Sequence, residues 1–152
     1  MVLRRLHLAA AITATATILA FWSTTVASEL FGDAAAVSAA KQAILWGMLI
    51  LVPAMAATGA SGFRIGGKWR SPVVARKKRR MAVIVSTGLL VLVPCAIFLA
   101  GRAATGIFDD WFYAVQGIEL AAGASNLALM SLNLRDGLRL RSGGRIARPA
   151  AA

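Results

Sequence analysis

One side chain in this sequence is a clear candidate for chemistry, because Glu119 lies within an otherwise apolar segment, residues 111–134. An ionised carboxylate is costly in hydrocarbon, so Glu119 should face other helices and be either paired or protonated. In one interpretation it has a catalytic role, as a proton-carrying or cation-binding carboxylate. In the other it is structural, bonded to a threonine, a glutamine or a backbone carbonyl that a proline leaves free.

The polar residues of the same segment recur at the spacing of a helix. With one glycine and one methionine they form the row Gln116, Glu119, Gly123, Asn126, Met130 and Asn133. Alternating steps of three and four residues place all six on one helix face. A helix that is apolar elsewhere lies in a membrane with such a face toward its neighbours. Asn126 and Asn133 could line a pathway or join helices by hydrogen bonds.

The single histidine, His7, opens the first apolar segment, and small alanines on its helix face leave room for a flat group. Met130 should lie at a similar depth, and an imidazole with a thioether suits the axial positions of a b-type haem. We therefore expect His7 and Met130 to bind haem iron. Trp22 and Asn126, from the same two helix faces, would line the cofactor site. In the alternative interpretation, His7 contacts lipid headgroups or a loop carboxylate.

Composition and charge placement indicate a membrane protein. The chain is 59% hydrophobic and 15% charged, with a mean hydropathy of +0.71, whereas soluble domains are about 25% charged. The net charge of +11 comes mostly from basic residues between and after the apolar segments. Such flanks are typical of cytoplasmic loops, and no basic face points to nucleic-acid binding. The lone Cys95 excludes an intrachain disulfide and a cysteine-based metal site.

Four apolar segments are long enough to cross a membrane as helices. They cover about residues 6–27, 42–63, 81–101 and 111–134. Of the seventeen Lys and Arg residues, all but Lys41 and Arg102 lie before the first segment, between the second and third, or after the fourth. Because Lys and Arg accumulate on the cytoplasmic side, we predict an all-α, antiparallel four-helix membrane bundle with both termini in the cytoplasm.

The ends of these segments lead to further predictions. One domain, residues 1–135, would hold the four spans, and the basic tail, residues 136–152, would be flexible. The first segment has the flanks of a signal peptide, but its length of about 20 residues favours a retained span. Aromatic side chains at the outer ends predict an interfacial belt, formed by Trp22, Trp46, Trp111, Phe112 and Tyr113.

The second and third segments share a seven-residue motif that begins with glycine and ends with proline, at residues 47–53 and 88–94. The motif is consistent with an inverted repeat or with chance among Leu- and Val-rich helices. Pro53 and Pro94 cannot donate a backbone hydrogen bond, so we expect each to kink its helix near the middle of the membrane.

A family resemblance rests on short motifs in about the first sixty residues. The run Arg5-Leu6-His7-Leu8 before an Ala-rich span with Trp22, and then Pro53-Ala54-Met55, resembles small four-span membrane proteins. These are the haem-binding protoporphyrinogen-oxidase type and the copper-resistance membrane family. The resemblance implies haem binding with His7 as a ligand. Those families usually carry further histidines that this chain lacks, so the second ligand would be missing or Met.

Three functions follow as hypotheses. The first is a haem- or quinone-associated redox component for electron transfer, with His7 and Met130 as ligands. The second is an accessory or assembly subunit without its own chemistry, held in a homodimer or a larger membrane complex. The third is a small proton-coupled transporter that uses Glu119. In each case the expected location is a bacterial-type inner membrane, and no short motif of a known enzyme class is present.

Overall fold

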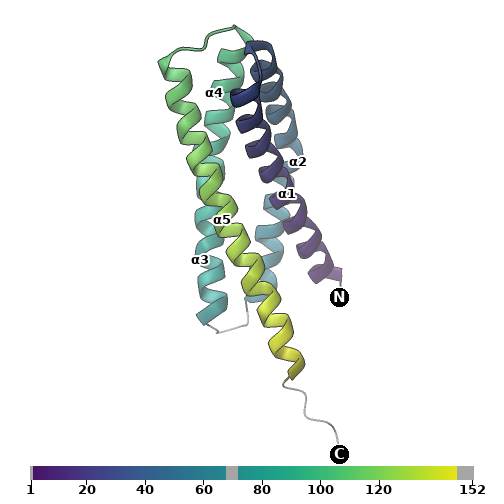
Figure 1. Cartoon of the computed structure of the whole chain (residues 1–152). Coiled ribbons are helices and arrows are strands. Elements are labelled where there is room, and N and C mark those ends of the chain that lie inside the picture. The colour runs from purple at the N-terminus through teal and green to yellow at the C-terminus, as the bar shows by residue number, and fades with distance from the viewer. Residues whose placement is uncertain (1, 68–71, 147–152) are drawn as a thin grey trace, which may run out of the picture.

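The structure is a computed structural model that describes residues 2–67 and 72–146, with side chains described as far as Gly137. The described chain is helical apart from its turns and forms four rods. In chain order the helices are α1 (Val2–Phe31), α2 (Ala34–Gly66), α3 (Pro72–Thr87), the π-helical segment η1 (Gly88–Leu92), α4 (Val93–Ala104) and α5 (Asp110–Ile146). The run α3–η1–α4 is one continuous rod (Figure 1).

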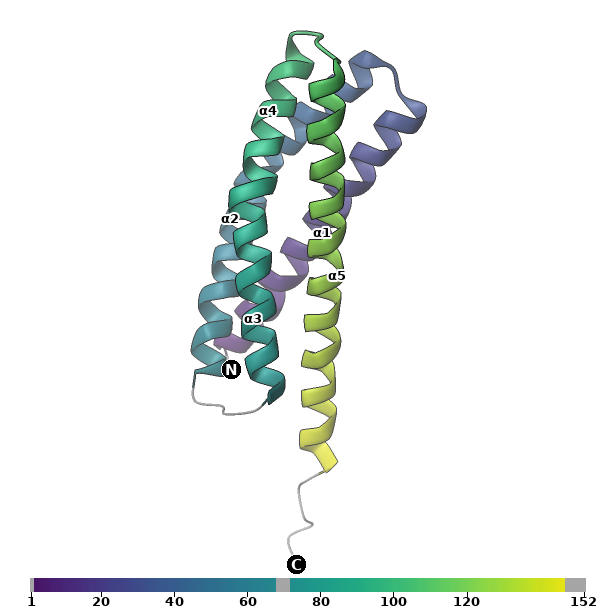
Figure 2. The same cartoon turned by 90° about the vertical axis from the view of Figure 1, so that its left-hand side faces the viewer.

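The rods pack into an up-and-down bundle in which α1 begins, and α5 ends, at the same end (Figure 1). We call this the basic end, because it carries the exposed residues Arg4, Arg5, Arg64, Arg76 and Arg79. The other is the turn end, where α1 meets α2 and α4 meets α5. Figure 2 shows α1 inclined to α5, and α1 packs mainly along α2.

Three rods are long and apolar enough to cross a membrane: α1, α2 and the run Pro72–Ala104. The mean hydropathy of α5, as far as the structure describes this helix, is too low for it to belong to the same group. The polar row on α5 lowers its average, although the helix is longer than the others. The predicted all-helical bundle is therefore confirmed, with three rods that are long and apolar enough to cross a membrane. Four spans and their orientation stay a prediction.

The outside of the bundle is apolar, as expected for a surface in contact with lipid. Large hydrophobic side chains project from every rod, among them Leu19, Trp46, Leu49, Leu90 at 76% exposure, Ile97 and Ile118. Water would disfavour an apolar surface of this extent, whereas acyl chains match it.

Two groups of buried apolar side chains hold the rods together. The larger joins all four rods near the middle of the bundle, with Ala14, Ile18, Leu51, Met55, Ile84 and Met130. The smaller lies toward the turn end and consists of Val37, Leu99, Ala103 and Phe112. Phe112 is 0% exposed and packs edge-on against Phe108. It is therefore a core residue and does not belong to the expected aromatic belt, whereas Trp46, Trp111 and Tyr113 are exposed.

The two turns at the turn end are shorter than expected. Only Gly32 and Asp33 separate α1 from α2, and the Asp33 carboxylate accepts a hydrogen bond from the Ala36 N–H at 2.8 Å. Residues 34–41, expected to link the first two predicted spans, are thus the first part of α2, because alanine favours helix once a cap is present. Lys41 consequently lies inside the bundle.

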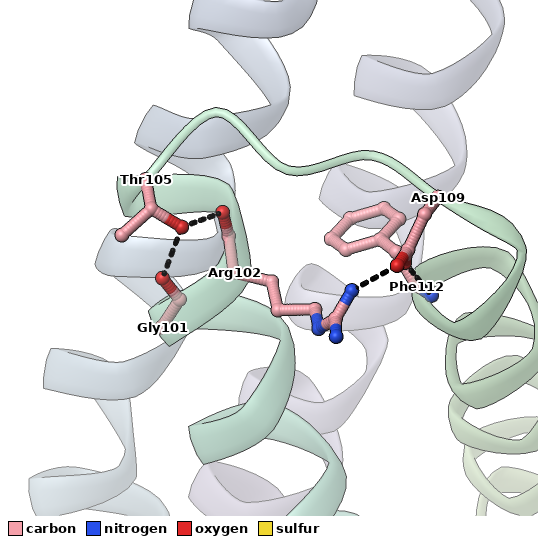
Figure 3. A network of polar contacts seen from close by, with 5 residues as sticks. All are labelled: Gly101, Arg102, Thr105, Asp109 and Phe112. Atoms are coloured by element: carbon pink, nitrogen blue, oxygen red, sulfur yellow. Dashed lines mark hydrogen bonds and ion pairs between the residues drawn. The ribbon is translucent and has the colours of Figure 1, made fainter.

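The second turn is held by Asp109, as Figure 3 shows. The Asp109 carboxylate accepts a hydrogen bond from the Phe112 N–H at 3.0 Å, which caps the start of α5. It also pairs with the Arg102 guanidinium at the end of α4. Gly106 has a φ of 70°, which only glycine adopts without strain. One carboxylate thus fixes both the start of α5 and its link to α4.

The two prolines behave differently. The helix α2 continues through Pro53 as one α-helix. Before Pro94 the backbone widens into the π-helical segment η1, where the Val93 N–H bonds to the Gly88 carbonyl. A π-turn can accommodate a proline, because proline has no backbone N–H to donate to the preceding turn of the helix. A departure from regular α-helix is therefore seen only before Pro94, and the kink expected at each proline stays a prediction.

At the other end of the chain, α5 continues through Asp136 to Ile146. The first part of the basic tail, expected to be flexible, is thus helical. The remainder of that prediction falls on residues 147–152, outside the described part of the chain.

Candidate functional site

Lys41 of α2 and Glu119 of α5 form an ion pair inside the bundle, with 2.5 Å between Nζ and Oε2. The Lys41 side chain is 1% exposed and that of Glu119 is 12% exposed. Removing two charges from water is costly, and their attraction offsets that cost only while both partners are present. Glu119 is therefore paired, one of its two expected states, and its partner is Lys41, which lies just before the second predicted span.

The position of Lys41 follows from the inner face of α2. Buried residues recur along this helix at steps of three or four, or multiples of them, at Val37, Lys41, Ile44, Leu51, Met55 and Thr58. The lysine is thus in phase with the apolar core positions. That phase, together with its isolation from the other basic residues, is the sequence signal that identifies Lys41 as a site residue.

A small cavity of about 50 Å³ borders Glu119, one partner of the ion pair. It lies among α1, α2, η1 and α5, and Glu119, Trp22, Thr25, Met48 and Leu92 are among its lining residues. This volume is far below the roughly 300–1,000 Å³ of a typical small-molecule pocket and is enough for a few water molecules. The lining is mostly apolar and does not include Lys41, so water held there would meet the Glu119 carboxylate and not the ammonium group.

Trp22 supports the same region from α1. Its indole N–H donates to the Leu120 carbonyl at 3.2 Å, which ties α1 to α5 one residue after Glu119. A methyl group added at Gly123 would come within 3.2 Å of the indole ring, so the glycine allows this approach. The structure thus brings together two sequence-predicted residues, Trp22 and Glu119, at one cavity.

The rest of the predicted row on α5 also faces inward. Gln116, Gly123, Asn126 and Met130 are buried, which confirms the face inferred from their spacing. The side-chain carbonyl oxygens of Gln116, Asn126 and Asn133 are buried without a hydrogen-bond partner among the described residues. Buried acceptors of this kind are usually satisfied by ordered water. The inner face of α5 therefore offers water sites on both sides of Glu119.

Asn126 holds the centre of this row. It is 1% exposed, and its amide nitrogen donates to the Ile84 carbonyl at 3.3 Å, which joins α5 to α3. The adjacent Gly88 of η1 lies close to both Asn126 and Met55. Asn126 thus has one of the two roles left open for it, since its amide nitrogen joins two helices; its side-chain oxygen has no hydrogen-bond partner among the described residues.

His7 lies near the basic end, between α1 and α2. Its Nδ1 is 2.9 Å from the Ser61 hydroxyl oxygen, and the Ser61 hydroxyl itself donates to the Ala57 carbonyl. Since a hydroxyl has one hydrogen, this arrangement assigns Nδ1–H as the donor to Ser61. The lone pair of the neutral ring is then on Nε2, the nitrogen that a metal or a proton would bind.

Met130 and His7 have different neighbours in the bundle. Met130 lies in the larger core group, packed with side chains of all four rods, whereas the His7 ring faces Gly62 of α2. Among the described residues, no group of three or more His, Cys, Asp or Glu side chains could hold a metal ion. Haem ligation by His7 and Met130 stays a prediction.

No family model, curated protein or solved structure matches the chain. Among the described residues, the Lys41–Glu119 ion pair with its adjacent cavity is the best candidate for a functional site.

Proposed function

We propose that this protein is a four-span membrane protein that moves protons across the bilayer, with Glu119 as the proton-exchanging carboxylate. The observation that carries the proposal is the buried Lys41–Glu119 ion pair beside a water-sized cavity. In helices long enough to cross a membrane, a buried charge pair is by default a candidate for an ion or proton pathway.

The ion pair and its neutral form, a Lys41 amine beside a Glu119 carboxylic acid, hold the same number of protons, so transfer between the two side chains alone moves no proton through the bundle. Net movement requires the pair to gain one proton and then lose one. In the proposed cycle the Glu119 carboxylate takes up a proton from one side of the membrane and releases a proton toward the other side, which restores the ion pair. Between these two steps the Lys41 ammonium faces a neutral acid, and this uncompensated buried charge is the high-energy state of the cycle.

The polar row on α5 extends the route in both directions. From Gln116 to Asn133 the helix rises about 25 Å, most of the roughly 30 Å hydrocarbon core. The unpaired oxygens of Gln116, Asn126 and Asn133 would hold water along this length. In the proposal α5 is therefore the fourth span, with both termini in the cytoplasm, as the distribution of Lys and Arg favours.

The test is proton flux into sealed vesicles that contain the purified protein and a pH-sensitive dye, driven by an imposed potential. The informative variant is the double replacement Lys41→Met with Glu119→Gln, because it leaves no unpaired charge in the bundle. Its flux should fall to the level of protein-free vesicles. The control Asp110→Asn removes an exposed carboxylate at the turn end and should keep the wild-type flux.

Two results would overturn the proposal. One is a wild-type flux no higher than that of empty vesicles. The other is an undiminished flux in the double variant, provided that circular dichroism shows the same helix content as the wild type.

A second candidate function, haem-associated electron transfer, is favoured by the free Nε2 of His7. The Ser61 hydroxyl fixes the ring through Nδ1, which is how hydrogen-bonded histidines are oriented for metal binding. Protein purified from cells supplied with haem should then show a Soret band that is lost in His7→Ala. A colourless wild-type protein would remove this candidate.

A further inference from the structure

A second cluster of charged residues lies outside the proposed proton route, at the basic end of the bundle. Its centre is Asp136 of α5, which is buried and accepts a hydrogen bond from Arg80 of α3 at 2.7 Å. This hydrogen bond, with further attraction from Arg80, Arg135 and Arg76, lowers the pKa of Asp136 below its ordinary value. One carboxylate thus lies within electrostatic reach of three guanidinium groups, so positive charge is in excess.

The three arginines do not share the carboxylate equally. Arg80 is partly buried and is held by Asp136, whereas Arg76 and Arg135 are exposed. Lys77 adds charge beside them, since its Nζ would lie 3.0 Å from a methyl group added at Gly137. Arg76 precedes Arg80 by one helical turn on α3, and Arg135 directly precedes Asp136 on α5. Their charges are not taken up by Asp136 and can bind a further anion.

The position of the cluster along the rod indicates which anion. Arg80 is followed directly by Met81, where the apolar stretch of the α3–η1–α4 rod begins. Further along this rod, Val83, Leu89 and Leu90 are exposed hydrophobic residues. A molecule with an anionic head at the arginines and a hydrocarbon tail along these side chains would match both surfaces.

We propose that Arg76, Arg80 and Arg135 bind the phosphate group of an anionic membrane phospholipid, whose acyl chains run along the exposed apolar side of α3. Asp136 positions Arg80 and does not touch the lipid. This site is independent of proton movement through the bundle, so either proposal can fail without the other.

The experiment measures lipid binding to the full chain in mild detergent, by counting bound lipids in native mass spectra. Phosphatidylglycerol is compared with phosphatidylcholine. The variant Arg76→Gln with Arg135→Gln removes two exposed charges and leaves the Arg80–Asp136 pair in place. The control Arg4→Gln with Arg5→Gln removes two exposed charges from α1 at the same end.

The wild type should bind phosphatidylglycerol in preference to phosphatidylcholine, and the site variant should bind it about tenfold or more weakly. The control variant should keep the wild-type affinity. Equal weakening in both variants would mean diffuse attraction and would overturn the site. So would equal binding of the two lipids, or release of the bound phosphatidylglycerol by inorganic phosphate at low concentration, which would indicate a site for free phosphate.

Discussion

Glu119 on α5 and Lys41 on α2 lie 78 positions apart in the sequence, and their charged atoms are 2.5 Å apart inside the bundle. The Lys41 ammonium has no access to water that could replace its partner, since Lys41 is among the most deeply buried residues of the described chain. The pair therefore couples two rods electrostatically, and the stability of the bundle should depend on both residues together.

Single and double replacements should reveal this coupling. Removing one partner of a buried pair costs about 3–5 kcal/mol, because the other charge is left without compensation. Glu119→Gln and Lys41→Met should each lower the free energy of unfolding by this order, as measured by denaturant titration in detergent. The double variant should be much more stable than the sum of the single losses predicts. Additive losses would show that the two charges do not interact.

The turn between α4 and α5 should give the bundle an acid-sensitive element. The hydrogen bond from Arg102, then the capping bond from the Phe112 N–H, lower the pKa of Asp109 from its ordinary value of 3.8. The stabilising contribution of Asp109 is complete above that ordinary value and is lost as the pH falls through the lower pKa of the folded state. The Asp109→Asn variant should therefore lose less stability than the wild type when thermal unfolding is followed from pH 5 down to about pH 3. Parallel losses in both proteins would contradict this role.

Close packing of α1 on α2 depends on Gly47. A methyl group added at this position would come within 2.5 Å of the Phe21 ring, so either that ring or one of the two helices must shift. Gly47→Ala should destabilise the bundle by about 1–3 kcal/mol, as overpacked core positions do. Gly117→Ala is the matched control, because nothing lies within 4 Å of its added methyl group. That control should be neutral or slightly stabilising, and equal effects of the two variants would contradict the packing.

The proposed fourth span can be tested by labelling single cysteines in a Cys95→Ala background. A maleimide that does not cross membranes should label Asp110→Cys from outside intact cells. Arg79→Cys and Arg135→Cys should react only after the membrane is permeabilised. Labelling of Asp110→Cys and Arg135→Cys from the same side would show that α5 does not cross the membrane.

Much of this architecture could be predicted from the sequence, because hydropathy and helical spacing are local properties. The inner face of α5 was identified correctly from the steps between Gln116, Asn126 and Met130, since three- and four-residue spacing specifies a face whatever the neighbouring helix is. The helical rods themselves follow from long apolar segments whose backbone groups must bond internally.

What could not be predicted depends on contacts between rods. Lys41 was assigned to a link because a charged residue lowers hydropathy, yet its partner on another helix makes burial possible. Phe112 was expected in an interfacial belt, but Leu99 and Ala103 of α4 cover it. Pro53 and Pro94 occur in the same sequence motif, and only Pro94 follows a π-helical segment. The motif alone therefore does not determine the local backbone conformation.

The most direct test of the central claim is whether the Glu119 carboxyl takes up and releases protons in the membrane. Dicyclohexylcarbodiimide reacts with protonated carboxyl groups in apolar surroundings, and mass spectrometry of digested protein locates the modified residue. We predict modification at Glu119, with loss of proton flux in proportion to the modified fraction. Full modification of Glu119 with unchanged flux, or flux without any modification of Glu119 under these conditions, would contradict the account.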